Sequence, residues 1–470
     1  MYYLGNLIIN GMYLYFFLSI IVNQYYSLKR FIKVSINVIF SKLNIVILLV
    51  ELVSLVFFKE YKVLFYLLNL GFSILFIVIN KPLKFKKTRR NLTLFLLSLL
   101  ISIFILPLSR FTSCIVIILS YLLLLPLEIK INSIYKEKAR IRLSKVSPKV
   151  IGITGSYGKT TFKNILYDVI KNKYITQVTP FNVNTPLGIT KFINNELKDD
   201  TEVLIVEIGI DEKNGMNKFK DFLSLDIGII TSIGENHLAN FKTLNNTLNS
   251  KMKIKNLIKK EGKLFLNNDD EYLFNIEEDN IIKFSKDKDI EVSIDINGLK
   301  YSYNNKEFLI PLYGSYIYSY LDGVIKISEF LGINKDYISL GLQNIRKIKR
   351  RLEVSKYKNG YFINDSYNIN INGVKESVNL LKSLDGNNVV ILGGIIEQGK
   401  EFVKSNNKIK SLLIDLNVIF IGEGNHPLTK NHQYKNLYIV SSLKEGYVLL
   451  DQLSFNNILL LAKSDDIFLR

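Results

Sequence analysis

The stretch Gly152–Thr161, GITGSYGKTT, connects the β-branched run Val150–Thr154 to a helical pattern over Phe162–Ile170. Its two inner glycines allow backbone N–H groups to turn inward around phosphate oxygens, and the lysine that follows supplies a positive charge. A threonine hydroxyl directly after such a lysine is a common Mg²⁺ ligand. The stretch therefore predicts a loop that binds nucleotide phosphates through Gly155, Ser156, Gly158, Lys159, Thr160 and Thr161.

This predicted phosphate loop departs at one position from the general pattern of such loops. That pattern places a glycine five residues before Gly158, where this chain has Ile153. The order strand, loop and helix nevertheless favours a phosphate site over an accidental glycine-rich turn. Phosphate loops occur in switches, motors, kinases and ligases, so the rest of the chain has to distinguish these classes.

From Lys149 onward, short β-branched runs alternate with amphipathic stretches, which predicts parallel α/β sheets. Ile290–Pro311 has the alternation of a small antiparallel piece, and Gly314–Leu331 is predicted to be helical. We predict one domain over residues 149–332 and a second α/β domain over residues 333–470. The predicted strands are Val150–Thr154, Val203–Glu207, Ile227–Ile233, Lys263–Asn267, Val389–Leu392, Val418–Ile421, Leu437–Val440 and Ile458–Leu461.

Residues 1–130 contain five apolar stretches with few acidic residues, which predicts a bundle of transmembrane helices rather than soluble core helices. Several approach the length of about 17–20 residues that crosses a bilayer. A cleavable signal peptide does not account for five stretches. Glu51 is an acidic residue inside one of them, and both a functional and an interhelical role are open for it. The stretches are Tyr3–Val22, Asn44–Phe58, Val63–Ile79, Leu92–Leu108 and Thr112–Ile129.

Basic residues set the predicted orientation of this region. The segments after the first, third and fifth stretches are rich in Lys and Arg, whereas those after the second and fourth contain few. The positive-inside rule then places the N-terminus outside and everything after residue 130 in the cytosol. Residues 131–148 are predicted to form a basic juxtamembrane linker, a helix near anionic headgroups.

The net charge of the chain follows the same division. The sequence has 61 Lys and Arg against 42 Asp and Glu, a formal net charge of +19. Residues 1–148 hold 19 of the basic residues and only 4 of the acidic ones. The excess therefore lies in the predicted membrane region and does not indicate a nucleic-acid partner. A single cysteine, Cys114, excludes a disulfide framework and a multi-cysteine zinc site.

Further motifs along residues 149–470 resemble those of the Mur ligases, most closely the MurF type, the branch that adds D-alanyl-D-alanine. Asp365–Asn370 is the segment that resembles this branch specifically, and the ordered set of motifs is stronger than any one of them. The motifs are the phosphate loop Thr154–Thr161, Asn182–Ile189, Glu207–Gly209, Ile233–Leu238 with Lys251 downstream, Asn267–Asp270, Arg351–Glu353, Asp365–Asn370 and Gly394–Gly399.

The resemblance implies a P-loop central domain, a Rossmann-like C-terminal domain and an ATP-dependent amide ligase of peptidoglycan precursor synthesis. Such ligases use ATP and Mg²⁺ to convert a carboxylate into an acyl phosphate, which an amine then attacks. The implied catalytic residues are Lys159, Lys251, His237 and Arg351, and Lys251 matches a carbamylated lysine. The implied nucleotide ligands are the phosphate loop, Asn267, Arg351 and Asp365. The implied Mg²⁺ ligands are Thr160, Glu207 and His237. The residues implied to contact the other substrates are Asn184, Thr185, Tyr367, Asn368 and Asn370.

Several of these residues also have an ordinary structural explanation. The alternative for Glu207 is a solvated acid at a strand end, for His237 a structural histidine, and for Lys251 a surface residue of a lysine-rich helix. Arg351 lies in a basic run that begins at Lys347. Asn368 and Asn370 are residue types that shape turns.

Three departures from the family pattern leave other functions open. Membrane stretches replace the family's soluble N-terminal domain, which holds the UDP end of the acceptor. Gly314–Tyr320 lacks two polar residues of a nucleotide-side motif, and Asn364 replaces an acid. The alternatives are a membrane ligase similar to poly-γ-glutamate synthase and a degenerate nucleotide-binding scaffold for envelope enzymes. A transporter is disfavoured because the apolar stretches show no inverted repeat.

The leading hypothesis is a multi-pass ligase of the bacterial cytoplasmic membrane with its catalytic domains in the cytosol. Its expected partners are the membrane, a muramyl-peptide-like acceptor linked to UDP or to a lipid, and other envelope-synthesis enzymes. The expected second substrate is an amino acid or a dipeptide such as D-Ala-D-Ala. No nucleic acid is expected as a partner.

Overall fold

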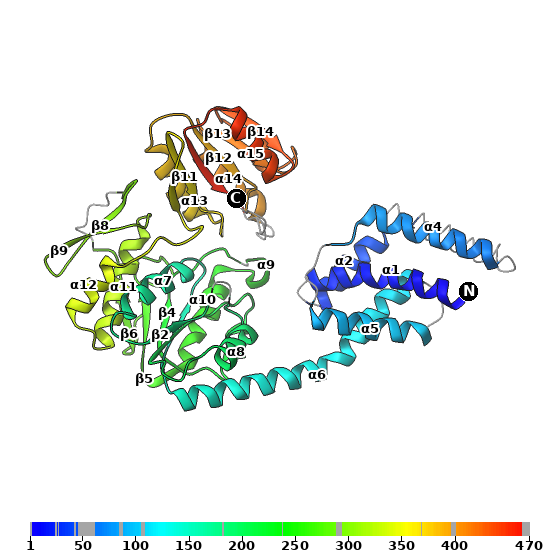
Figure 1. The fold of residues 1–470 in the computed structure, drawn as a ribbon, viewed down its shortest axis with the longest axis horizontal. Helices are drawn as coiled ribbons and strands as arrows, with labels where there is room; N and C mark the ends of the chain where they lie inside the picture. Colours follow the sequence, from blue (N-terminus) through cyan, green and yellow to red (C-terminus); the bar gives the residue numbers. More distant parts are fainter. Residues whose placement is uncertain are drawn as a thin grey trace. The chain divides into compact units, whose positions relative to one another are not determined.

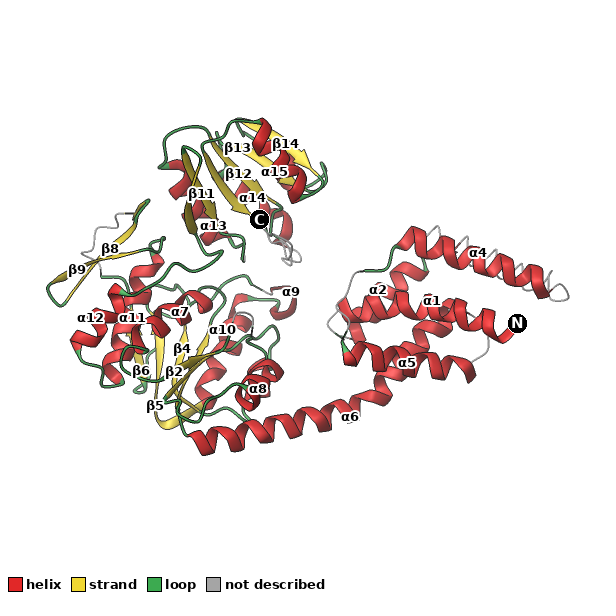
Figure 2. Ribbon diagram, viewed as in Figure 1, coloured by secondary structure: helices red, strands yellow, loops and turns green. Residues whose placement is uncertain are grey.

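A computed structural model describes residues 2–23, 26, 28–41, 44–45, 62–83, 88–104, 109–180, 183–236, 238–287, 294–367, 369–395 and 401–462. The contacts within it divide the chain into two compact units, Met1–Ile134 and Tyr135–Arg470. Figure 1 shows the chain coloured along the sequence, and Figure 2 shows its helices and strands.

The first unit is helical, and α1 packs against α2, α4 and α5. Its core combines aliphatic residues with several aromatic ones, of which Tyr13, Phe17, Phe31 and Phe76 are fully buried. Four of the five predicted apolar stretches are helices, whereas Asn44–Phe58 lies almost entirely outside the described residues. The helices that reach into this unit are α1 (Tyr2–Asn23), α2 (Leu28–Ile39), α4 (Lys62–Asn80), α5 (Arg89–Phe104) and α6 (Ser109–Val146).

Among the described residues, one helical segment, Ser113–Val146, is long and apolar enough to cross a membrane, with a mean hydropathy of 2.3 over an 18-residue window. Ile8–Asn23 and Leu70–Asn80 are shorter apolar segments. The predicted bundle of five transmembrane helices is therefore not confirmed and stays a prediction. It is supported by leucine side chains on α5 and α6 that are more than half exposed, because such a surface is unusual in water: Leu92, Leu96, Leu100, Leu123 and Leu127.

Helix α6 continues without interruption through the segment predicted to be a linker, and its last twelve residues belong to the second unit. There Ala139 is fully buried, and Leu143 and Val146 pack against the same apolar cluster. The Arg142 guanidinium donates to the Leu197 carbonyl oxygen at 2.7 Å. The second half of the predicted juxtamembrane linker 131–148 is thus part of the folded second unit.

The first domain of the second unit is built on a parallel six-stranded sheet of order β2-β3-β1-β4-β5-β6. Alternate residues of β3 face two different cores: Val203 and Ile205 lie in one, and Leu204 and Val206 in the other. Both sheet faces are therefore covered, as in doubly wound folds. The strands are β1 (Lys149–Thr154), β2 (Thr176–Val178), β3 (Val203–Glu207), β4 (Leu225–Ile230), β5 (Ile258–Asn267) and β6 (Ile281–Phe284).

Helices from distant parts of the chain cover one face of this sheet. Helix α7 (Lys159–Ile170) packs against α11 (Tyr316–Phe330) and α12 (Lys335–Gln343), and α11 also contacts β6 (Figure 1). Helix α8 (Pro186–Asn195) contributes to the core on the other face, and α10 (Leu244–Met252) follows β4.

A small antiparallel sheet follows the parallel one. It consists of β7 (Ile294–Asp295), β8 (Gly298–Tyr303) and β9 (Lys306–Ile310). The antiparallel piece predicted within residues 290–311 is therefore confirmed. So is the helix predicted over 314–331, which is α11.

The chain passes from the first core of this unit to the next between Ile348 and Leu352. Ile338, Leu342 and Ile348 pack in the core of the parallel sheet, whereas Leu352 packs in the core of the C-terminal domain. The structure thus places the domain boundary later than residue 332, because α12 packs on α7 and belongs to the first domain.

The C-terminal domain has a six-stranded sheet of order β10-β11-β15-β12-β13-β14, parallel except for the β10–β11 hairpin. All eight strands predicted from the sequence are present, and β2, β6, β10 and β11 were not predicted. The elements are β10 (Glu353–Tyr357), β11 (Gly360–Asn364), α13 (Ile371–Lys382), β12 (Asn388–Leu392), α14 (Phe402–Leu412), β13 (Asn417–Ile421), β14 (Asn436–Val440), α15 (Leu443–Gln452) and β15 (Asn457–Leu461).

Candidate active site

The phosphate loop connects the carboxyl end of β1 to α7, and its glycines are required by their surroundings. Gly155 has φ 152° and Gly158 has φ 78°, in the range that side chains disfavour. A Cβ on Gly155 would lie 2.0 Å from the Thr231 Oγ1, and one on Gly158 would lie 1.7 Å from the Tyr320 hydroxyl. The loop is thus enclosed on two sides by β4 and α11.

Two lysine ammonium groups meet at one carbonyl oxygen of this loop. Lys159 Nζ donates to the Gly155 oxygen at 2.7 Å, and Lys251 Nζ donates to the same oxygen at 3.0 Å. Burial, together with the nearby Lys159, holds the pKa of Lys251 well below its ordinary value. Burial also lowers the pKa of Lys159, although Glu207 opposes the shift. Lys251 is therefore a buried residue of the site and not a surface lysine.

Glu207, at the end of β3, is a buried carboxylate surrounded by donors. Thr160 Oγ1 donates to its Oε2 at 3.0 Å, and Asn184 Nδ2 donates to Oε1 at 3.3 Å. Lys163 Nζ lies 3.1 Å from Oε2. Burial raises the pKa of Glu207, but Lys163, Lys159 and the hydrogen bonds outweigh it, so the pKa lies below its ordinary value. The alternative of a solvated strand-end acid is excluded.

Lys163 is a site residue that the sequence analysis missed. Its side chain is buried, and Nζ donates to the Thr179 oxygen at 3.0 Å in addition to its ion pair with Glu207. The signal was present, because Lys163 lies four residues after Lys159 and residues at that spacing share one helix face.

A cavity of about 390 Å³ extends from the phosphate loop to the C-terminal domain. Five of the predicted nucleotide-binding residues line it: Gly158, Thr161, Asn267, Arg351 and Asp365. Tyr316 and Tyr320 lie in the same wall, with ring centroids 5.3 Å apart. The segment that departs from the family pattern therefore supplies aromatic side chains to this cavity.

Asp365 and Arg351 come from the C-terminal side of the cavity. Asp365 accepts hydrogen bonds from the Ser377 hydroxyl at 2.7 Å and the Leu352 N–H at 3.3 Å, and burial raises its pKa. The Arg351 guanidinium lies 4.2 Å from the centre of the Tyr367 ring. Its Nε is buried and has no hydrogen-bond partner among the described residues. Arg351 is thus poised for a further acceptor and is not a generic surface base.

The remaining predicted residues divide into three groups. Asn184 binds Glu207, so it acts on the carboxylate side of the site. Thr185 and Asn370 cap α8 and α13 through the N–H groups of Gly188 and Gly373, and Asn370 also lines the cavity. His237 and Asn368 lie outside the described residues, so their predicted roles stay predictions.

These side chains can bind a phosphorylated nucleotide with a hard cation. Hydroxyl and carboxylate oxygens suit Mg²⁺, which usually keeps several water ligands and needs only one or two protein groups. The Thr160–Glu207 pair beside the phosphate loop fits that requirement. Lys159 and Arg351 place positive charge where phosphoryl oxygens would lie.

Residues 153–319 match the protein family described as Mur ligase middle domain. This part of the chain is therefore similar to Mur ligase middle domains. The match includes the phosphate loop, Glu207, Lys251 and Asn267, whereas Arg351 and Asp365 lie beyond it. The recognition made from the sequence motifs is therefore confirmed for the wall of the cavity that carries the phosphate loop.

Full-length relatives extend the similarity beyond the Mur ligase middle domain. The chain is 27% identical over 274 residues to the UDP-N-acetylmuramoyl-tripeptide–D-alanyl-D-alanine ligase of Bacillus subtilis, which covers 56% of this chain and 60% of that protein. It is 31% identical over 307 residues to the ligase of the same name from Borreliella burgdorferi, which covers 61% and 64%. The chain thus spans less than two thirds of the length of these relatives.

The fold of this chain also resembles that of a solved Mur ligase. The MurF ligase from Thermotoga maritima, solved in complex with ADP, superposes with a TM-score of 0.63 at 21% identity. The superposition covers 71% of this chain and 80% of that one. The predicted α/β Mur ligase fold, with its parallel sheets, is thereby confirmed.

Proposed function

We propose that this chain is an ATP-dependent amide ligase of peptidoglycan precursor synthesis. It would add a D-amino acid or D-Ala-D-Ala to a muramyl-peptide acceptor, as the names of its relatives suggest. The observation that carries the proposal is the gathering of Lys159 and Arg351 around the phosphate loop, beside the buried Lys251 and the ionised Glu207. Such a concentration of positive charge suits the transfer of a phosphoryl group.

ATP and Mg²⁺ are the cofactors that these residues fit. Thr160 and Glu207 would hold the metal, with His237 as a third candidate. Asn267, Arg351 and Asp365 would bind the rest of the nucleotide, and the Asp365 carboxylate suits the hydroxyl groups of a ribose. The ADP complex of the Thermotoga relative supports a nucleotide at this site.

The proposed reaction has two steps. A carboxylate oxygen of the acceptor attacks the γ-phosphorus of ATP, ADP leaves, and an acyl phosphate forms. The amine of the second substrate then attacks the acyl carbon and loses a proton, and inorganic phosphate leaves. Lys159 and Arg351 would neutralise the charge that develops on the transferred phosphoryl group, and closure of the two domains around the cavity would exclude water from the acyl phosphate.

Lys251 would act as a carbamate. Its lowered pKa favours the neutral amine, which can add to CO₂ and release a proton. The product is an anion close to Lys159, which would compensate the local excess of positive charge. The family resemblance implies the same modification at this position.

One observation favours a second candidate function, that of a nucleotide-binding scaffold without turnover. Tyr316 and Tyr320 occupy the cavity wall where the family pattern has polar residues. The lysines and Glu207 favour turnover instead. Product formation by the purified protein distinguishes the two candidates.

We place the enzyme in the cytoplasmic membrane, with its N-terminus outside and its catalytic domains in the cytosol. Support comes from the apolar first half of α6 and from the basic segments on one side of the predicted spans. About 9 Å of helix separates Ile129, the last residue of the apolar run, from Tyr135, where the second unit begins. Confinement near the bilayer would raise the effective concentration of a lipid-linked acceptor.

The deciding experiment is an assay of the detergent-purified full chain. ATP hydrolysis and amide formation are followed with UDP-linked and lipid-linked muramyl peptides and a panel of amino acids and dipeptides. Amide formation coupled to ADP release supports the ligase, and nucleotide binding without any product contradicts it. A fragment of residues 131–470 is then compared with the full chain. Equal use of soluble UDP-linked acceptors and no loss with bilayer-embedded ones would contradict the lipid-linked acceptor.

A further inference from the structure

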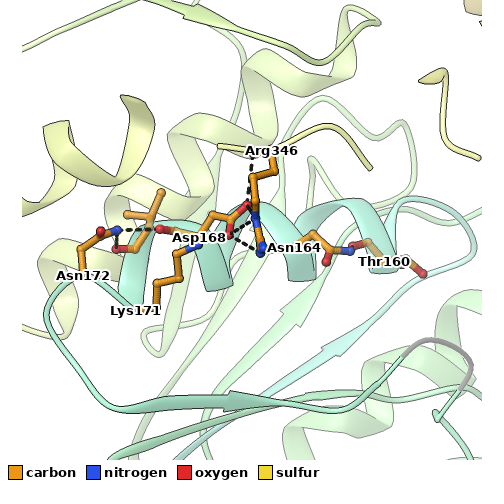
Figure 3. Close-up of polar contacts among 7 residues, drawn as sticks. Thr160, Asn164, Asp168, Lys171, Asn172 and Arg346 are labelled. Carbon is orange, nitrogen blue, oxygen red and sulfur yellow. Dashed lines mark hydrogen bonds and ion pairs between the residues drawn. The ribbon is translucent and has the colours of Figure 1, made fainter. Parts of the chain in front are cut away.

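A buried carboxylate on α7 holds an arginine from the segment that joins the two domains of the second unit. Asp168 accepts from Arg346 through Nε at 3.0 Å, through Nη2 at 2.6 Å and through the backbone N–H at 3.2 Å. Figure 3 shows Arg346 reaching to Asp168 on the helix. The Asp168 side chain is 3% exposed, whereas that of Arg346 is 63% exposed. Lys171, the residue directly after the end of α7, also pairs with Asp168.

Helix α7 begins at the phosphate loop, so this ion pair is connected to the site by a rigid element. Eight residues, or about 12 Å of helix, separate Thr160 from Asp168. Asn164 lies between them and donates to the Thr160 oxygen at 2.7 Å (Figure 3). The helix is also held by α11 and α12, which pack on it. A group fixed to Asp168 therefore keeps a constant position relative to Thr160.

Arg346 lies five residues before Arg351, and the chain between them leads directly into the cavity wall. Ile348 packs in the core of the first domain, so this part of the segment is anchored. Arg350 and Leu352, on either side of Arg351, both have left-handed backbone conformations, with φ of 59° and 47°. Such conformations are costly for residues other than glycine and persist only where their surroundings impose them.

Hydrogen bonds to residues of the C-terminal domain hold the other end of this turn. The Arg350 N–H donates to Glu353 Oε2 at 2.9 Å, and the Arg350 oxygen accepts from the Tyr367 N–H at 3.2 Å. The Leu352 N–H donates to Asp365 Oδ1 at 3.3 Å. The turn that presents Arg351 is therefore fixed to the C-terminal domain after residue 350, and to α7 only through the segment that begins at Arg346.

We propose that Arg346 and Asp168 form a positioning pair for Arg351. The pair fixes the start of the connecting segment to the phosphate-loop helix, so that Arg351 keeps its place relative to Lys159 when the two domains close on a nucleotide. This inference rests on the proposed function, because Arg351 is assigned there to the nucleotide. Arg346 itself lies outside the cavity lining and contacts no predicted ligand group.

The simpler alternative is that the ion pair only stabilises the fold. Breaking a buried pair leaves an uncompensated charge and destabilises a protein whatever its function. Lys171 supplies the matched control, because it pairs with the same carboxylate but directly follows α7 and is not part of the connecting segment. Lys171→Met removes one cation from Asp168 and leaves the connection to Arg346 in place.

The test compares Arg346→Met, Arg346→Lys and Lys171→Met in the full chain, each alone and combined with Arg351→Ala. kcat and KM for ATP are measured in the ligase assay, ADP affinity is measured by titration, and thermal unfolding is recorded for each variant. We expect Arg346→Met to lower kcat by roughly 10- to 100-fold, the range in which misplacement of a reacting group acts. Lys171→Met should leave kcat within about twofold, and Arg346→Lys should restore part of the loss, because it keeps the charge without the two-pronged contact.

The double variants with Arg351→Ala show whether Arg346 acts through Arg351. If Arg346 acts through Arg351, then Arg346→Met costs little more in a protein that already carries Arg351→Ala. Losses that multiply in the double variant would overturn the proposal, as would an equal loss in Lys171→Met. If Arg346→Met does not fold, Arg346→Lys takes its place in the same cycle. A wild-type chain that forms no product contradicts the proposed function, and an active wild type with independent losses contradicts only the positioning pair.

Discussion

The two walls of the cavity hold their charged groups in different ways. On the side of the phosphate loop, charged side chains contact one another and the ends of regular elements: Glu207 binds Thr160, Lys163 and Asn184 at the end of β3. On the C-terminal side, Arg351 projects from a strained turn, packs over Tyr367 and keeps its Nε without a partner among the described residues.

This difference indicates which parts of the site are preformed. Donors and acceptors that already satisfy one another need no rearrangement before a nucleotide binds, which favours electrostatic preorganisation. The position of an arginine on a turn between two domains depends instead on how that turn is held when the domains close. We infer that the first wall determines whether phosphates bind, and that the second wall determines whether the bound nucleotide reacts.

The largest effect is expected at the centre of the preformed wall. Lys159→Ala removes the ammonium group that Gly155 orients, and should lower ATP-dependent product formation by about 10³-fold or more, on the scale of other lost charge contacts. Initial rates at saturating ATP measure this loss. Lys260→Ala, at an exposed lysine on β5, is the control and should behave as the wild type. Undiminished turnover in Lys159→Ala would remove the ligase proposal.

A smaller loss is expected for the carboxylate of the same wall. Glu207→Gln keeps the shape of the side chain but removes its charge, so we expect roughly a 10²-fold loss of kcat and a higher Mg²⁺ requirement. A Mg²⁺ titration at fixed ATP measures both effects. The same substitution leaves Lys163 buried without a counter-charge, so the protein should also unfold at a lower temperature. An unchanged Mg²⁺ dependence would show that Glu207 is not a metal ligand.

Lys251 tests whether the preformed wall contains an added anion. Lys251→Ala should lose activity and regain part of it when a small carboxylate such as acetate is supplied, because the carboxylate can take the place of a carbamate. Activity as a function of acetate concentration measures the rescue, and Lys159→Ala with acetate is the matched control without expected rescue. Normal kinetics in Lys251→Ala would exclude a role in catalysis.

The smallest effect is expected on stability at the second wall. Burial raises the pKa of Asp365, so between about pH 4 and that raised value the folded state holds a proton that the unfolded chain has lost. Stability therefore falls as the pH rises through this window. Asp365→Asn removes the penalty and should stabilise the protein at pH 7 by about 1 kcal/mol, with no gain below about pH 4.

Thermal unfolding of wild type and Asp365→Asn at a series of pH values measures this difference. ADP affinity should fall in the same variant, because the charged acceptor for a ribose hydroxyl is lost. A variant that is less stable than the wild type at pH 7 would show that the hydrogen bonds to Ser377 and Leu352 outweigh the cost of burial.

Much of the preformed wall could be predicted from the sequence, because its residues are local to strand ends. Lys159 and Thr160 follow β1 within six residues, and Glu207 ends an unbroken apolar run. Parallel strands bring such ends to one edge of a sheet. Lys163 was missed although its helical spacing pointed to the same face.

The second wall and the connection between the walls depend on contacts that no local pattern contains. The Asp168–Arg346 pair joins residues 178 positions apart. The left-handed turn around Arg351 contains no glycine, the residue type that would have indicated it in the sequence. The missed strands β2 and β6 are only three and four residues long, and the β10–β11 hairpin carries lysines that weaken its alternation.

The shared helix α6 has a consequence for how the protein is made. Residues 135–146 leave the ribosome before any strand of the catalytic domains, yet Ala139 later fills the same core as Ile189 and Leu204. The first segment of the second unit to be synthesised is therefore held at the predicted exit from the bilayer until its packing partners arrive. A fragment that begins at β1 would lack this segment and expose an apolar strip, so it should aggregate where one that begins at residue 131 stays soluble.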